Sequence, residues 1–125
     1  MDWATRVSLA AQVMTAFKVN KLSGSANWRS WELAIDEVAR VCGWKDTLEH
    51  ENDCWDPQYP CVPCQAVYPM LRSTCTVEVK EHIAGVTCAK KAYAILHNTF
   101  GPASVEGKRY ALEQARIEGL ATIAQ

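Results

Sequence analysis

The fold class is decided by the stretch Asn27-Trp-Arg-Ser-Trp-Glu-Leu-Ala-Ile-Asp-Glu-Val-Ala-Arg-Val-Cys-Gly43. Its apolar side chains recur at steps of three and four residues, whereas its charged side chains fall largely on the other side. The apolar positions are Trp28, Trp31, Ile35, Val38 and Cys42. Asn27 precedes the first periodic residue, and its side-chain oxygen is expected to cap the first turn. Gly43 follows the last turn. The stretch therefore predicts an amphipathic helix over 28–42.

The same spacing extends to both sides of this helix. It predicts further helices over residues 1–17, 66–73 and 76–84, a helix that starts at the cap Thr87 and reaches Phe100, and a last helix from the cap Ser104 to about Ala124. Thr87 and Ser104 are the expected N-caps of the last two. Prolines and cysteines crowd residues 53–64 and favour a loop there. Outside residues 18–22, apolar and polar side chains do not alternate with period two, so the sequence predicts no β-strand there. Residues 1–125 are thus predicted to form one all-α domain, a compact bundle of about five helices.

The two aromatic residues at the start of the predicted helix 28–42 allow two interpretations. Trp28 and Trp31 are three residues apart, so both belong to one helix face. Such a pair can form an exposed platform for bases or peptides, but at this spacing it is more often part of the core. We expect the pair to share one core with Ile35, Tyr93, Leu96 and Phe100, because each helix must bury its apolar stripe.

Composition and charge exclude several classes of protein. The chain has 125 residues, of which 49% are hydrophobic and 22% are charged, so a mainly disordered protein is excluded. The formal net charge of −1 disfavours strong direct binding to RNA or DNA, which requires a basic excess. The longest weakly polar stretch, residues 7–17, is too short for a membrane span and a poor signal peptide. We expect a cytoplasmic protein that makes no contact with membranes.

A family resemblance is carried by the segment Leu22-Ser-Gly-Ser-Ala-Asn-Trp-Arg-Ser-Trp31. It resembles the start of the Gag polyprotein of copia-type LTR retrotransposons, whose signature is Leu-x-Gly, then Asn-aromatic, two residues and Trp. Two later segments extend the likeness, which runs from about residue 19 to 120. The matching positions are Leu22, Gly24, Asn27, Trp28, Trp31, Trp44, Ala89, Tyr93, Leu96 and Phe100.

The resemblance implies the N-terminal part of a helical capsid region, from an active element or a domesticated copy. Such a domain associates with copies of itself in a virus-like particle around retrotransposon RNA, with no catalysis and no cofactor. The implied partners are other copies of the chain, weakly bound in isolation, and other parts of a Gag polyprotein. RNA is an indirect partner. The sequence itself is consistent with a role without catalysis, because it has no nucleophile–base pair, Gly-rich phosphate loop or paired carboxylates in a recognisable setting.

The six cysteines leave a second class of function open. Cys61-Val-Pro-Cys64 has the spacing of a redox dithiol, so the alternative is a small cysteine-dependent binding or redox module that uses Cys61 and Cys64. No strand precedes the motif as in thioredoxin-like enzymes. The same pair could join Cys54, Cys75, Cys88 or His82 in a zinc site, but no second knuckle completes it, so we expect no bound metal. Cys42, Cys75 and Cys88 are expected to be small core residues. His50, His82 and His97 are scattered, and none is expected to be catalytic.

Overall fold

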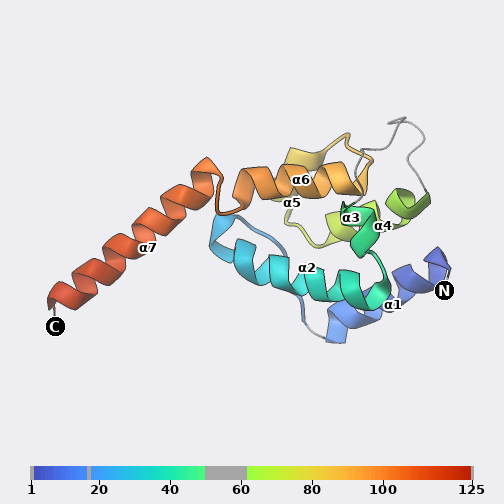
Figure 1. Ribbon diagram of the computed structural model, residues 1–125, viewed down its shortest axis with the longest axis horizontal. Helices are drawn as coiled ribbons and strands as arrows, with labels where there is room; N and C mark the ends of the chain where they lie inside the picture. The colour runs from blue at the N-terminus through green and yellow to red at the C-terminus, as the bar shows by residue number, and fades with distance from the viewer. Residues whose placement is uncertain (1, 17, 50–61, 125) are drawn as a thin grey trace.

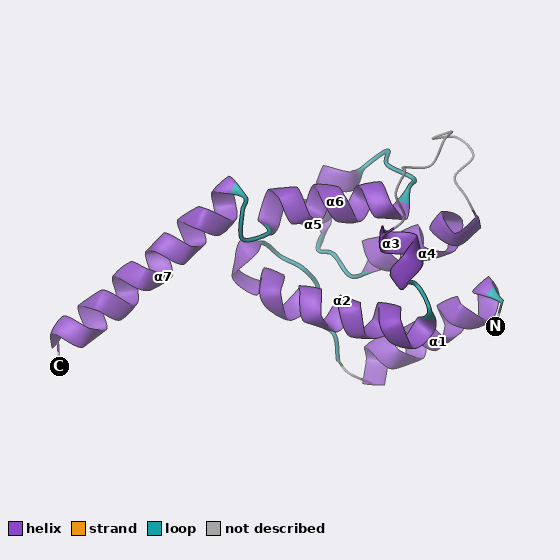
Figure 2. Ribbon diagram, viewed as in Figure 1, coloured by secondary structure: helices purple, strands orange, loops and turns teal. Residues whose placement is uncertain are grey.

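The computed structural model describes residues 2–16, 18–49 and 62–124, and these residues are predominantly helical (Figures 1 and 2). Within these described ranges, five α-helices have 12 residues or more, two α-helices are shorter, and two segments are 3-10 helices. In chain order they are α1 (Trp3–Ala16), η1 (Ser25–Asn27), α2 (Trp28–Cys42), α3 (Lys45–Glu49), α4 (Val62–Ser73), α5 (Val77–Lys80), η2 (Glu81–Ile83), α6 (Ala89–Phe100) and α7 (Val105–Ala124). Leu22 and Cys75 form an isolated parallel bridge, and the described residues contain no strand. The predicted all-α bundle is confirmed.

Helix α2 follows the pattern of its sequence closely. All five residues of the predicted apolar stripe, from Trp28 to Cys42, are buried. Gly43 ends the helix in the left-handed conformation with φ 75°, and its N–H donates to the carbonyl of Ala39. A residue with a side chain is strained in this conformation, which explains the glycine. The predicted bounds of α2 are confirmed.

Helix α4 differs from the expectation. The expected loop at 53–64 lies outside the described residues as far as position 61, but residues 62–64 are already helical. Pro63 lies in the first turn, where the missing N–H of a proline costs nothing because that group has no partner within the helix. Pro69 lies in the interior of α4, because the helix begins at Val62 rather than at Ala66 as predicted.

Two helices, α5 and α6, begin in the segment that follows α4. Thr76 caps α5 by accepting a hydrogen bond from the N–H of Val79, at 3.5 Å. The predicted helix over 76–84 tightens into the 3-10 segment η2 at Glu81, and Val79 and Ile83 point inward as expected. Helix α6 begins one residue later than predicted. Its N-cap is Cys88 rather than Thr87, because Cys88 has the extended backbone of a cap and Ala89 is the first helical residue.

The buried side chains form two clusters, one toward each end of the bundle. The aromatic core, as we call the first, consists of Leu22, Trp28, Trp31, Ile35, Leu71, Cys75, Val79, Ile83, Ala92, Leu96 and Phe100. The second, the cysteine core, consists of Ala10, Val38, Ala39, Cys42, Trp44, Cys64, Val67, Cys88 and Ala89. Helices α2, α4 and α6 contribute to both clusters, so the two cores form a continuous interior between these helices.

Helix α7 leaves the body of the molecule and extends away from it, opposite the end at which α1 begins (Figure 1). Ser104 caps it as predicted, accepting a hydrogen bond from the N–H of Gly107 at 2.8 Å. Twenty residues at 1.5 Å per residue give α7 a length of about 30 Å. Among the described residues, no helix is both long enough and apolar enough to cross a membrane.

Candidate functional site

The motif residues Leu22, Gly24, Asn27, Trp28 and Trp31 lie together where η1 and α2 begin. Leu22 is fully buried and is hydrogen-bonded to residues 74–76, the connection between α4 and α5. Its N–H donates to the carbonyl of Thr74 at 2.8 Å, and its carbonyl accepts from the N–H of Thr76 at 3.0 Å. These two bonds form the parallel bridge to Cys75. The entry segment is therefore bound to the middle of the chain before α2 starts.

The predicted capping role of Asn27 is wrong. Its side chain makes no cap hydrogen bond to α2. Instead, Asn27 Oδ1 accepts from the backbone N–H of Ser23 at 3.0 Å and from the Ser23 hydroxyl at 3.2 Å, while Nδ2 donates to the carbonyl of Lys21 at 2.8 Å. The 3-10 turn η1 directly before α2 leaves the side chain facing backward along the chain. Asn27 thus closes the loop 21–27 rather than the helix.

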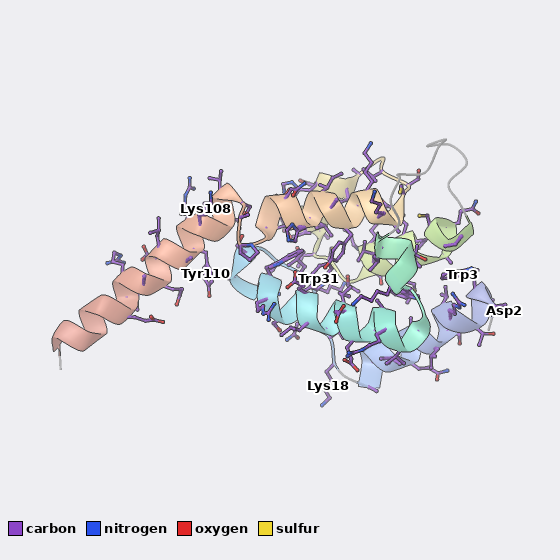
Figure 3. All side chains as sticks on the ribbon, in the orientation of Figure 1. Asp2, Trp3, Lys18, Trp31, Lys108 and Tyr110 are labelled. Atoms are coloured by element: carbon purple, nitrogen blue, oxygen red, sulfur yellow. The ribbon has the colours of Figure 1, made fainter. Side chains whose placement is uncertain are left out.

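Four rings from α2 and α6 form an aromatic cluster that extends from the buried Trp28 and Trp31, through the partly buried Tyr93, to the exposed His97. The Trp28 and Trp31 rings are 5.2 Å apart, and the Tyr93 ring stacks on Trp31 at 6.1 Å. The His97 ring meets Trp28 edge-on at 5.6 Å. Figure 3 shows Trp31 between α2 and α6, and the exposed fractions of Trp28 and Trp31 are only 2% and 1%. The pair belongs to the core as predicted, and it is not an exposed stacking platform.

The other matched positions are also structural. Ala89 and Leu96 are fully buried on α6, and Phe100 lies at the end of this helix against the aromatic core. Tyr93 is partly buried against the same cluster. Trp44 is fully buried in the cysteine core, where its indole N–H has no hydrogen-bond partner among the described residues. The positions that carry the family resemblance are therefore divided between the two cores.

The junction between η1, α6 and α7 contains residues that sequence analysis did not single out. The Ser25 hydroxyl donates to the carbonyl of Phe100 at 2.9 Å, and the Ser25 N–H donates to Glu106 Oε1 at 3.3 Å. A Cβ at Gly24 would lie 3.2 Å from the same carboxylate oxygen. The motif segment thus holds both the end of α6 and the first turn of α7. No local pattern indicates this role, because Ser25 and Glu106 are 81 positions apart.

Two glycines allow α7 to start close to the end of α6. A Cβ at Gly107 would overlap the carbonyl oxygen of Gly101 and come within 2.9 Å of the Ser104 hydroxyl oxygen. The hydroxyl of Ser104 donates in turn to the carbonyl of Gly101 at 2.6 Å. Ser104 was predicted as the cap, but the close approach between Gly101 and Gly107 was not predicted.

A small apolar pocket opens beside this junction. It has a volume of about 200 Å³ and lies between the start of α2 and the first turns of α7. Its walls include Trp28, Phe100, Pro102, Tyr110 and Ala111. Because α7 forms one wall of the pocket, the orientation of that helix determines the shape of the pocket.

Helix α7 carries the largest set of exposed apolar side chains on one element of the described structure. The exposed fractions are 74% for Val105, 72% for Leu112, 47% for Ile117 and 39% for Tyr110. At 100° per residue, Val105 and Leu112 lie on one side of α7, whereas Tyr110 and Ile117 lie on nearly the opposite side. Figure 3 shows Lys108 and Tyr110 toward opposite edges of the helix. We call these four residues the α7 surface.

Cys42, Cys75 and Cys88 are buried as predicted, Cys64 is buried as well, and one pair of these thiols is brought together. Cys42, Cys64 and Cys88 belong to the cysteine core, and Cys75 belongs to the aromatic core. The Sγ atoms of Cys64 and Cys88 are 3.9 Å apart. Burial raises the pKa of the Cys42 thiol, and it raises the pKa of Cys75 to about 11. Cys54, Cys61 and His50 lie outside the described residues.

The remaining candidates for chemistry are not assembled into a site within the described structure. His82 meets the Phe100 ring edge-on at 5.2 Å, and His97 contacts Trp28, so both rings pack against aromatic side chains. Among the described residues, no group of three or more His, Cys, Asp or Glu side chains could hold a metal ion.

Comparisons of the chain with protein-family models, curated proteins and solved structures found no match. The proposals below therefore depend on the residues and geometry described above.

Proposed function

We propose that this chain is a capsid-type structural domain that associates with copies of itself, as the resemblance to copia-type Gag implies. The observation that carries the proposal is the α7 surface. Val105 and Leu112 are each more than 70% exposed on a helix that extends away from the body (Figure 1). Each of two nearly opposite sides of α7 carries a pair of exposed apolar side chains, Val105 with Leu112 and Tyr110 with Ile117, and we infer that these pairs are the contact points between copies.

The arrangement of the motif residues supports the same function. The segment 22–31 is tied to α4, α5, α6 and α7 by hydrogen bonds and ring contacts, which hold the base of α7 in a defined direction. A repeated assembly requires the same contact geometry in every copy. A contact helix that projects from a rigid junction meets this requirement, whereas a helix on a flexible linker does not.

The proposed partners follow from the charge and the surface. Copies of this chain are the primary partner, other parts of a Gag polyprotein contribute further contacts, and RNA is enclosed without strong direct binding. The net charge of −1 supports the indirect role of RNA. The proposed role involves no catalysis. The alternative function would use Cys61 and Cys64; Cys64 is buried with its Sγ atom 3.9 Å from that of Cys88, and Cys61 lies outside the described residues.

The test compares association of the wild-type chain with that of surface variants. Leu112→Glu and Ile117→Glu each place a charge on one of the two apolar sides of α7. Leu33→Glu is the matched control, because Leu33 is 53% exposed on α2 in the body. Light scattering coupled to size exclusion, from micromolar to millimolar concentration, measures the average mass, and circular dichroism verifies that each variant is folded.

We expect the wild-type chain to be monomeric or weakly dimeric at micromolar concentration and to gain mass as concentration rises. At least one α7 variant should lose this gain, and Leu33→Glu should retain it. A wild-type chain that stays monomeric throughout, and that also fails to enter particles when fused to a capsid C-terminal domain, would contradict the proposed function. Association that is unaffected by both α7 variants would remove the α7 surface from the proposal.

A further inference from the structure

Two thiols that are distant in sequence meet inside the cysteine core. Cys64 lies in the first turn of α4, and Cys88 is the N-cap of α6, 24 positions later. The thiol of Cys64 donates a hydrogen bond to the sulfur of Cys88 at 3.9 Å. Cys64 is fully buried, and Cys88 is 4% exposed. The two sulfur atoms are already neighbours, and a disulfide bond of about 2.0 Å requires them to approach by about 2 Å.

We propose that Cys64 and Cys88 are a redox-sensitive pair that closes to an intramolecular disulfide when hydrogen peroxide reaches the cysteine core. The pair differs from the dithiol expected from the sequence, which consists of Cys61 and Cys64. In a reducing compartment such bonds are transient and are typical of redox sensing. The inference goes beyond the proposed assembly function and does not depend on it.

The chemistry is balanced with hydrogen peroxide as the oxidant. The sulfur of Cys88, the more accessible of the two, attacks one peroxide oxygen. The O–O bond breaks, one water leaves, and Cys88 becomes a sulfenic acid. The sulfur of Cys64 then attacks the sulfur of Cys88, so that the S–S bond forms as the S–O bond breaks. The thiol proton of Cys64 leaves with the hydroxyl group as a second water. Two thiols lose two electrons in total, and one peroxide is reduced to two waters.

The position of the pair determines what the bond does. Helices α4 and α6 pack against each other, and each contributes to both cores. A bond at this point joins the start of α4 to the start of α6 and restricts the unfolded chain to a closed loop. For a loop of this length, the expected rise in the midpoint temperature of unfolding is roughly 10 °C. Oxidation would therefore lock the body of the domain without altering the direction of α7.

The experiment treats the purified full chain with one equivalent of hydrogen peroxide and maps the product by mass spectrometry after tryptic digestion. Cys42, Cys75 and Cys88 fall on separate tryptic peptides, whereas Cys64 shares the peptide 46–72 with Cys54 and Cys61. Cys61→Ser and Cys54→Ser variants resolve that ambiguity. Cys88→Ala removes one member of the pair, and Cys42→Ala is its matched control within the cysteine core.

We expect a loss of 2 Da, a cross-link between peptides 46–72 and 81–90, and reversal by dithiothreitol. The cross-link should persist in Cys61→Ser, Cys54→Ser and Cys42→Ala and be absent from Cys88→Ala. If Cys88→Ala does not fold, the wild-type map together with the two serine variants still identifies the pair. The proposal would be overturned by a cross-link within peptide 46–72 only, or by loss of the cross-link between peptides 46–72 and 81–90 in Cys61→Ser. Oxygen addition without any cross-link, or one zinc ion retained per untreated chain, would also overturn it.

Discussion

Trp31 shows how one side chain can join several elements of this protein. Its ring lies in the aromatic core between Trp28 and Tyr93, and its Nε1 donates to the Thr74 hydroxyl at 3.1 Å. The Thr74 hydroxyl donates onward to the carbonyl of Leu71 at 2.6 Å, at the end of α4. A single residue thus connects α2, α4 and α6 by both packing and hydrogen bonding.

Replacement of Trp31 with alanine should lower the free energy of unfolding by about 3–5 kcal/mol, because it removes a fully buried indole and leaves a cavity. Trp31→Phe retains a ring and loses the hydrogen bond, so its cost should be smaller. Urea denaturation monitored by circular dichroism measures both. The control is Leu33→Ala, an exposed position expected to change stability by less than about 0.5 kcal/mol. A loss under about 1 kcal/mol for Trp31→Ala would mean that this indole is exposed in solution.

Cys75 predicts a decline of stability in alkaline solution. Burial raises the pKa of its thiol from 9.0 to about 11 in the folded protein. Between these values the unfolded chain loses the proton and the folded chain keeps it, so stability falls as pH rises from about 9 to 11. The slope for one such group approaches 1.4 kcal/mol per pH unit. Below about pH 9 the thiol is protonated in both states, so it adds no pH dependence to the free energy of unfolding.

The measurement is the difference between wild type and Cys75→Ala in the free energy of unfolding, from pH 7 to 10.5. The difference isolates Cys75 from Cys42 and from the tyrosines and lysines, which titrate in both proteins. The wild type should lose its advantage over the variant above pH 9. A difference that stays constant across this range would show that the Cys75 thiol ionises equally in both states.

Among the elements, α7 differs from the other long helices in what holds it. Helices α2 and α6 bury a complete stripe, whereas α7 contacts the body near its base, through the junction formed by Ser25, Glu106 and Gly107. Its apolar side chains lie on two nearly opposite sides rather than on one. Its direction is therefore set by the close approach at its first turn.

Gly107→Ala and Gly119→Ala should have opposite effects, although both place alanine in the same helix. A Cβ at Gly107 would overlap the carbonyl oxygen of Gly101, so the start of α7 must shift at a cost of about 1–3 kcal/mol. A Cβ at Gly119 meets no atom within 4 Å among the described residues, so alanine should stabilise α7 by up to about 1 kcal/mol. Amide hydrogen exchange in α7 measures both changes. Equal protection in the two variants would contradict the close packing of α6 and α7.

At the scale of the whole molecule, the proposed interactions depend on two features. Its charges nearly balance, with 13 Lys and Arg against 14 Asp and Glu. Its shape is a helical body with one extended helix (Figure 1). The charge balance limits attraction to polyanions, and the extended helix supplies apolar surface for a protein contact.

Binding of this chain alone to RNA should be weak, non-specific and sensitive to salt. The reason is the net charge of −1, which supplies no excess of cations to replace the counterions of a polyphosphate. Fluorescence anisotropy with a labelled RNA oligomer, at about 50 and 150 mM salt, measures the dissociation constant. A submicromolar constant at the higher salt concentration would contradict the indirect role proposed for RNA.

Local sequence alone predicted most of the longer helices and the buried face of α2, but it did not predict the short helix α3. The stripe of α2, its end at Gly43, the cap at Ser104 and the burial of Trp28 and Trp31 were all predicted, because the 3.6-residue period and the turn chemistry of Gly and Ser act over a few neighbouring residues. The division of these buried residues between two cores was not predicted. It depends on which helices meet.

Only the tertiary structure decided how distant segments join. The side chain of Asn27 bonds to Ser23 and Lys21 rather than capping α2, and α4 begins at Val62. The thiol of Cys64 lies beside that of Cys88. The direction of α7 depends on Ser25 and Gly101, which come from other parts of the chain. The Asn27 bonds are local, at separations of four and six positions, and depend on the 3-10 turn η1. The Cys64–Cys88 and Ser25–Glu106 contacts join residues that are close only after the helices have packed, and local periodicity carries no information about such contacts.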